Sequence, residues 1–193
     1  MYPAATLEIE SPETIENWRP LVQWLLAIPH VVVLYFLGIA GVVAWVVAWF
    51  TTVFTGRLSE EVAGWLAMIH RYQFRVTAYT GFMYEEYPPF DFTRTLEEPG
   101  GSPVSVSFEP QFEERDRLTC VLRIFWLIPI AIFSAIVYFA ATILWIGAFF
   151  AVLFTGRWPE GLLDFVVKAL RLNLRANTYG SFLTDQYPPF ALE

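Results

Sequence analysis

Two long uncharged stretches dominate the pattern of apolar and polar positions along the chain. Residues 20–56 and residues 124–156 contain no Asp, Glu, Lys or Arg. A run of about 18 or more apolar residues is typical of a membrane-embedded helix, whereas a surface helix of a soluble protein keeps one polar face. The pattern therefore predicts two membrane-embedded segments, each formed as one helix or as a short hairpin. Pro29, about ten residues inside the first run, should kink or break its helix.

A helix with an arginine stripe is predicted after each apolar run, over residues 59–84 and 159–184. In the second helix polar residues recur every three or four positions, which places them on one face. That stripe consists of Asp164, Lys168, Arg171, Arg175 and Thr178, and the first helix retains Arg71 and Arg75. Asp164 and Lys168 are spaced to form an ion pair on the helix surface. An arginine stripe beside a wide apolar face is typical of a helix at a membrane surface.

Two short segments with period-two alternation precede the apolar runs. Leu7 and Ile9 alternate with polar neighbours over residues 5–10, and Val104, Val106 and Phe108 do so over residues 103–109. This pattern indicates half-buried strands. The two segments are either unrelated extended linkers or strands that lie on one side of the membrane and pair.

The chain repeats itself at a spacing of one hundred residues. The repeated motifs are Phe54-Thr55-Gly56-Arg57 with Phe154-Thr155-Gly156-Arg157, and Tyr87-Pro88-Pro89-Phe90 with Tyr187-Pro188-Pro189-Phe190. The first motif predicts a turn, since glycine accepts a left-handed conformation and Ser59 can cap the next helix. The sequence thus predicts a mainly α, integral-membrane tandem repeat: module 1 over residues 1–90, an acidic linker with the second strand over residues 91–117, and module 2 over residues 118–193.

Composition and charge support this assignment and limit the kinds of molecule that the protein can bind. Apolar residues make up 56% of the 193 residues and charged residues 16%, against about 45–50% and 25% in soluble domains. The net charge is −7, with nine acidic residues between Glu85 and Asp116. That segment should stand in water, away from an anionic lipid surface. The charge pattern contains no basic footprint for nucleic acid, and the single cysteine, Cys120, excludes an intramolecular disulfide.

Three membrane arrangements are compatible with the repeat. The apolar run and the charged helix of each module can both span, the apolar run can enter and leave on one side, or the apolar run alone can span. The last arrangement would invert the second module relative to the first, as in many transporters. The sequence leaves all three open.

The motifs together resemble a known family. Ile28-Pro29-His30, the two Phe-Thr-Gly-Arg motifs, Arg157-Trp158-Pro159-Glu160-Gly161 and the two Tyr-Pro-Pro-Phe motifs are similar to those of an uncharacterised family of bacterial, largely actinobacterial, integral-membrane proteins defined by a domain of unknown function, often in tandem. The resemblance implies a multi-pass protein of the bacterial cytoplasmic membrane. It supplies no catalytic residues, and Ile130 replaces His30 in the second module.

Candidate chemistry is sparse. His30 and His70 are not repeated, and no histidine or cysteine spacing fits a metal site, so we expect no enzyme activity, cofactor or metal. The repeated charged residues are candidate contacts for anionic lipid: Arg57, Arg71, Arg75, Arg157, Arg171 and Arg175. The leading hypothesis is a non-enzymatic scaffold or accessory subunit that contacts membrane lipids and packs with a larger membrane complex or with itself. The alternative is binding or transport of anionic lipid or a small solute at the seam between the repeats.

Overall fold

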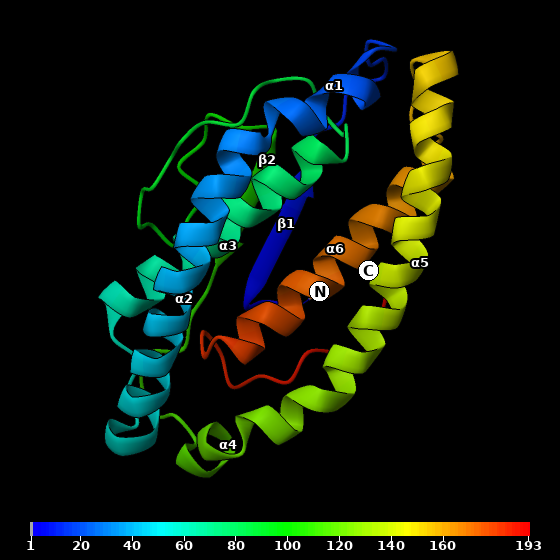
Figure 1. The fold of residues 1–193 in the computed structure, drawn as a ribbon. Helices are drawn as coiled ribbons and strands as arrows, with labels where there is room; N and C mark the ends of the chain where they lie inside the picture. The colour runs from blue at the N-terminus through cyan, green and yellow to red at the C-terminus, as the bar shows by residue number, and fades with distance from the viewer. Residues whose placement is uncertain (1) are drawn as a thin grey trace.

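The computed structural model describes residues 2–193 and has two similar halves (Figure 1). The first half contributes β1 (Ala5–Ile9), α1 (Arg19–Leu26), α2 (Ile28–Thr55) and α3 (Glu60–Thr80). The second half contributes β2 (Val104–Phe108), α4 (Arg117–Val121), α5 (Arg123–Thr155) and α6 (Glu160–Gly180). The fold is mainly helical, and the tandem organisation predicted from the sequence is also the organisation of the structure.

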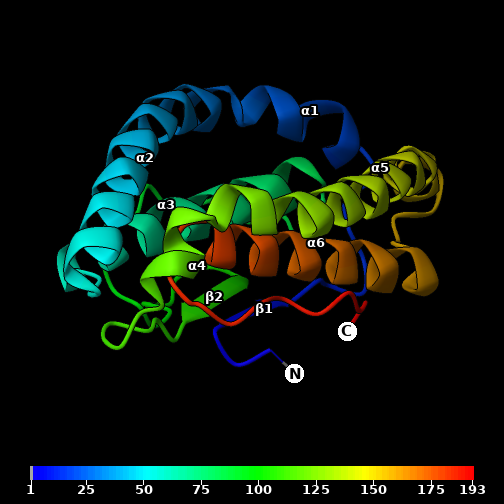
Figure 2. The ribbon, with the colours of Figure 1, turned by 90° about the horizontal axis from the view of Figure 1, so that it is seen from below.

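The elements are stacked in three layers, which Figure 2 shows from the side. β1 and β2 form a two-stranded sheet on one side of the molecule, with both chain ends nearby. The middle layer consists of α3, which packs on β2, and α6, which packs on β1. The long helices α2 and α5 pack on α3 and α6 respectively and lie away from the sheet.

The predicted pairing of the two strands is confirmed. β1 and β2 pair antiparallel with Leu7 opposite Val106 at the centre, and the apolar side chains of both strands face the helices. Two antiparallel strands are related by a twofold axis perpendicular to their sheet. The same axis relates the two modules, so both modules lie on the same face of the sheet.

Reciprocal contacts across this pseudo-twofold axis join the modules. The indole Nε1 of Trp45 in α2 donates to the carbonyl of Gly180 at 2.8 Å, and that of Trp145 in α5 donates to the carbonyl of Gly81 at 3.1 Å. Each long helix is thereby bonded to the end of the other module's charged helix. The twofold relation also makes α2 and α5 run in opposite directions (Figure 1).

Glycine elbows connect the long helices to the charged helices, as predicted. Gly56 and Gly156 end α2 and α5 with φ of 71° and 65°, a left-handed conformation that favours glycine. Ser59 occupies the N-cap position of α3, but its side chain makes no capping hydrogen bond.

The charged helices end four residues before their predicted limits. Phe82 and Phe182 adopt positive φ values of 47° and 65°, which turn the chain away from the helix axis. The following N–H groups, those of Met83 and Leu183, bond back to carbonyls of the last helical turn, a common way to satisfy a helix C-terminus.

The two apolar runs break at different places. In module 1 the break lies at Ala27, so Pro29 falls in the first turn of α2, where proline is tolerated. In module 2 the break lies at Leu122, and Pro129 is inside the continuous helix α5. Neither run forms a hairpin.

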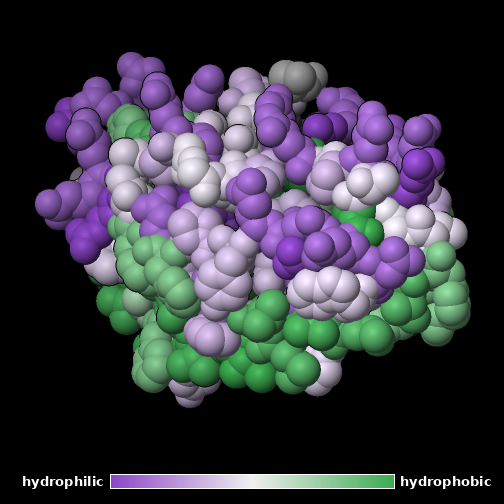
Figure 3. Space-filling view, turned by 90° about the horizontal axis from the view of Figure 1, so that it is seen from above, coloured by the Kyte–Doolittle hydropathy of each residue, from purple (hydrophilic) through white to green (hydrophobic). Residues whose placement is uncertain are grey.

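The outer helices are apolar and exposed. α2 and α5 are long and apolar enough to cross a membrane, yet only 11% and 22% of their most apolar windows are buried. They are therefore not core helices. Figure 3 shows their face as a continuous hydrophobic surface opposite a hydrophilic one. The most exposed aromatic side chains on it are Tyr35, Phe36, Phe54, Phe125, Phe139 and Phe154.

Candidate functional site

The arginine stripe of α3 lies inside the protein. Arg71 is 1% exposed, and its guanidinium is surrounded by main-chain carbonyls of the linker and β2. Those carbonyls belong to Thr93, Thr95, Leu96, Glu97 and Val106, at 2.9–3.4 Å. Burial lowers the pKa of Arg71 from its usual value, and the neighbouring Glu98 carboxylate opposes that effect.

Arg75 lies one turn further along and is equally buried. Its guanidinium pairs with Asp91 at 3.0 Å and with Glu98 at short range. The Glu98 carboxylate also lies 3.3 Å from Arg71 Nε and accepts from the main-chain N–H of Val106 at 2.9 Å. Glu98 therefore joins both arginines to β2.

Module 2 shares one of these arginine contacts, and the partners of its second arginine differ. Arg171 Nε donates to the Leu7 carbonyl of β1 at 2.9 Å, the counterpart of the Arg71–Val106 bond. Arg175 is 5% exposed and donates to the carbonyls of Ala191 and Glu193. Burial lowers the pKa of Arg175, and the Glu193 carboxylate opposes that shift.

These positions change the hypothesis of lipid contact. Arg71, Arg75 and Arg175 are buried with partners inside the chain, so their guanidinium groups do not reach a lipid headgroup. The expected placement at the membrane surface failed because the stripe is covered by the linker and the sheet. Only Arg57 and Arg157, at the two elbows, are exposed, and Arg57 lies 3.7 Å from Glu113. The predicted ion pair between Asp164 and Lys168 is confirmed at 2.8 Å.

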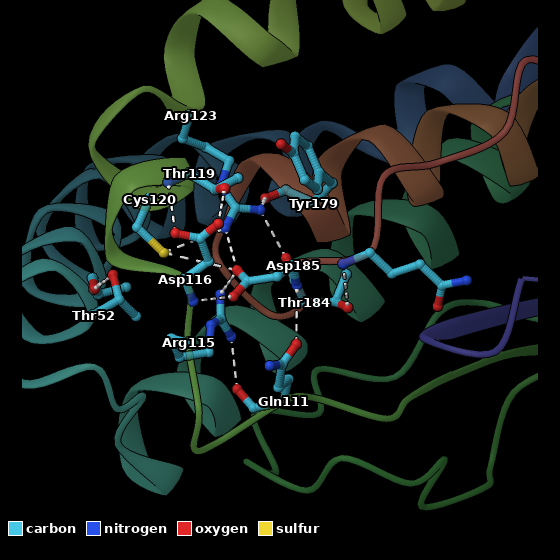
Figure 4. Close-up of polar contacts among 12 residues, drawn as sticks. Thr52, Gln111, Arg115, Asp116, Thr119, Cys120, Arg123, Tyr179, Thr184 and Asp185 are labelled. Atoms are coloured by element: carbon cyan, nitrogen blue, oxygen red, sulfur yellow. Dashed lines mark hydrogen bonds and ion pairs between the residues drawn. The ribbon is translucent and has the colours of Figure 1, made fainter.

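A buried polar cluster that sequence reasoning missed lies at the start of α5 (Figure 4). Asp185 forms an ion pair with Arg115 at 2.8 Å and accepts a hydrogen bond from Arg123 at short range. Arg123 also donates to the carbonyls of Tyr179 and Thr184, and its guanidinium lies 4.1 Å from the centre of the Tyr179 ring. Module 1 has Ile15, Gln23 and Glu85 at the positions of Arg115, Arg123 and Asp185, so the repeat gave no signal for it.

This cluster connects three parts of the fold. Arg115 bonds to the elbow at Gly56, and Arg123, at the start of α5, bonds to the end of α6 at Tyr179 and to Thr184 just after it. The Asp116 side chain caps α4 by accepting from the N–H groups of Leu118 and Thr119. Cys120 is buried and lies within 3.7 Å of Asp185. Within residues 2–193, no group of three or more His, Cys, Asp or Glu side chains could hold a metal ion.

A groove runs along the seam between the modules. One part, of about 480 Å³, lies between Trp45 and α5 above the end of α6. Another, of about 450 Å³, lies between the end of α3 and Trp145. The walls are mostly apolar, and the floor carries neutral polar side chains: His70, Ser134, Asn173, Asn177, Ser181, Thr77 and Thr80.

Two polar atoms of this floor are buried without a hydrogen-bond partner in residues 2–193. They are Nδ1 of His70 and Oγ of Ser134. The other nitrogen of His70 contacts the Ser181 hydroxyl at 3.1 Å. Burial lowers the pKa of His70 to about 4, so its ring is neutral at physiological pH. The seam is suited to a neutral group with an apolar body, rather than to an anion.

The fold and the seam define a tandem-module helical protein with one apolar face. Residues 17–91 and 117–191 each match the family model described as Domain of unknown function (DUF4389). The chain belongs to this family and carries its domain twice. Neither a curated protein nor a solved structure matches the chain significantly.

Proposed function

We propose that this protein is a non-enzymatic membrane platform whose apolar face enters one leaflet while its sheet side remains in water. α2 and α5 would then lie along the membrane surface instead of crossing it. The water-facing side would receive a protein partner or a second copy. From the family resemblance, the membrane would be the bacterial cytoplasmic membrane.

The position of the ends of α2 is the observation that supports this proposal. On the N-terminal side of α2, Arg19 at the start of α1 donates to the Glu85 carbonyl at 2.9 Å. At the C-terminal end of α2, the Gly56 carbonyl accepts from the Arg115 N–H at 3.2 Å. Glu85 and Arg115 belong to the acidic stretch between Glu85 and Asp116, whose charges are costly to place in a bilayer. Both ends of α2 therefore favour the same aqueous side.

α5 has the same arrangement in the second module. Arg123 at its start pairs with Asp185. At its end, the Gly156 carbonyl accepts from the Ile15 N–H at 2.7 Å, and Asn17 donates to the Leu153 carbonyl at 3.0 Å. These contacts favour an α5 that enters and leaves on one side.

Helix length agrees with placement along the membrane. The 28 residues of α2 and the 33 residues of α5 correspond to about 42 Å and about 50 Å. A bilayer core is only about 30 Å thick. An upright helix of either length would extend apolar residues well beyond it, whereas a helix in one leaflet has no such limit.

Sided labelling tests this placement. In a Cys120→Ala background, single cysteines replace Ser102, Arg57 and Arg157, and membrane vesicles are treated with an impermeant maleimide. We expect all three to react from the same side, because the Gly56 elbow contacts Arg115 of the linker and the Gly156 elbow contacts Ile15, which follows β1 in the chain. A cysteine at Phe36, whose side chain is exposed on α2, should be protected from both sides. Labelling of the elbows and of Ser102 from opposite sides would refute the proposal. It would favour the arrangement in which the long helix and the charged helix of each module both span the membrane.

The platform role needs its own test. Purification in mild detergent, followed by light scattering and identification of co-purified chains, should reveal a partner or self-association. Free monomer alone, at every concentration and in every detergent tried, would contradict the role without affecting the membrane placement.

The seam groove supports a second candidate function, the binding of a neutral lipid or small solute. Its neutral polar floor between apolar walls carries this alternative. Mass spectrometry of the purified protein should detect a retained neutral ligand, and Ala135→Trp, which fills the groove, should remove it. Gly147→Trp, in open space on α5, is the matched control. Equal retention by both variants would exclude the groove.

A further inference from the structure

The pseudo-twofold axis maps the Glu98 site of module 1 onto a pocket in module 2. Arg71 and Arg75 correspond to Arg171 and Arg175, and Val106 of β2 corresponds to Leu7 of β1. Both sites lie at the sheet side of the molecule, where a charged helix meets a strand of the other module. The middle layer of helices separates both from the apolar face.

In module 1 a carboxylate of the chain itself fills this site. Glu98 accepts from Arg75 Nη2, from the main-chain N–H of Val106 at 2.9 Å and from that of Gly100 at 3.1 Å, and lies 3.3 Å from Arg71 Nε. Its side chain is 12% exposed. The arrangement is a carboxylate-binding site that the Glu98 side chain of the same protein occupies.

In module 2 the corresponding position is a pocket of about 130 Å³, which Arg171, Arg175 and the Leu7 region of β1 line. Among residues 2–193, Arg171 has one hydrogen-bond partner, the Leu7 carbonyl. Glu193 lies at the rim, half exposed, 3.9 Å from Arg175. In an extended strand the N–H and C=O of one residue point to the same side, so the Leu7 N–H faces the pocket with its carbonyl. The Arg171 guanidinium and the Leu7 N–H thus face the pocket, and Arg175, which donates to Ala191 and Glu193, lies beside them.

We propose that this pocket binds a carboxylate group of a water-soluble ligand. Arg171 and Arg175 would take the positions that Arg71 and Arg75 hold around Glu98, and the Leu7 N–H would take that of Val106. Arginine forks recognise carboxylates through charge-assisted hydrogen bonds. The pocket has room for one carboxylate and a few carbon atoms. The carboxylate can come from a free organic acid or from an acidic side chain of an extended peptide.

Calorimetry on the full chain in detergent tests the site with three probes: succinate, inorganic phosphate and a blocked peptide with the sequence of residues 91–100, the segment that supplies Glu98. We expect succinate or the peptide to bind with one equivalent, and the stronger of the two identifies the source. Binding of phosphate alone, or of none of the three at millimolar concentration, would overturn the proposal.

Matched variants place the binding in the pocket. Arg171→Gln should weaken it by roughly tenfold or more, whereas Arg157→Gln, the same change at an exposed elbow, should leave it unchanged. Glu193→Gln should strengthen binding by removing a nearby carboxylate. Equal effects of the two arginine variants would refute the assignment.

A gain-of-site variant provides a further test. Glu98→Ala empties the module 1 site, so a folded variant should bind two equivalents where the wild type binds one. A folded Glu98→Ala protein that still binds one equivalent would contradict the equivalence of the two sites. These measurements in detergent are independent of the membrane placement proposed above.

Discussion

Glu98→Gln should destabilise the protein strongly, although glutamate and glutamine have nearly the same shape. The change removes a charge that faces the two buried guanidinium groups of Arg71 and Arg75, and it replaces one acceptor oxygen by a donor. Breaking a buried ion pair by removing one partner costs about 3–5 kcal/mol. Arg75 retains Asp91 at 3.0 Å, and Arg71 retains its ring of carbonyls. We therefore expect a loss of about 2–3 kcal/mol in the free energy of unfolding.

The assay is unfolding of the purified protein in detergent, followed by tryptophan fluorescence. Glu97→Gln is the control, because Glu97 is the adjacent residue, carries the same charge and is exposed. That variant should lie within about 0.5 kcal/mol of the wild type. If the two variants unfold at the same denaturant concentration, Glu98 does not hold the linker to α3, and the description of the buried arginines is wrong.

Other predictions concern the seam. In Gly81→Ala the new Cβ would lie 2.2 Å from the Trp145 ring, so we expect a loss of about 2–4 kcal/mol in unfolding free energy through overpacking and a lost indole hydrogen bond. Gly147→Ala meets no atom within 4 Å and should stabilise α5 by about 0.5–1 kcal/mol. Because burial lowers the pKa of His70 to about 4, the unfolded chain binds a proton first as the pH falls below about 6.5. Wild-type stability should therefore drop between pH 6.5 and 4, by up to about 3 kcal/mol relative to His70→Gln; parallel pH profiles in denaturant titrations would contradict this.

The sequence predicted the elements of this fold well, because they depend on local patterns. The alternation around Leu7 and Val106 identified the strands, and the left-handed turn at Gly56 followed from the residue type.

The surroundings of the arginine stripe could not be predicted in the same way. Helical periodicity places Arg71 and Arg75 on one face, but it does not say what covers that face. Their partners, Glu98 and the carbonyls of the linker, lie more than twenty residues along the chain for Arg71. The same limit applies to Asp185, whose partners Arg115 and Arg123 are distant in sequence and absent from the first module.

Membrane placement was left open for a related reason. Hydropathy identifies an apolar helix but not the direction in which its ends point. The contacts of Gly56 with Arg115, and of Gly156 with Ile15, join each elbow to a segment from the other half of the chain. Only the tertiary structure brings those segments together.

The paired indole bonds of Trp45 and Trp145 have a consequence for the domain itself. Each module completes the other, as the two subunits of an isologous dimer do. The linker converts what would be an association between two molecules into an intramolecular one, independent of protein concentration. It also allows the sequences of the two halves to differ, so that Glu98 fills one copy of a symmetric site while Glu193 lies at the rim of the other.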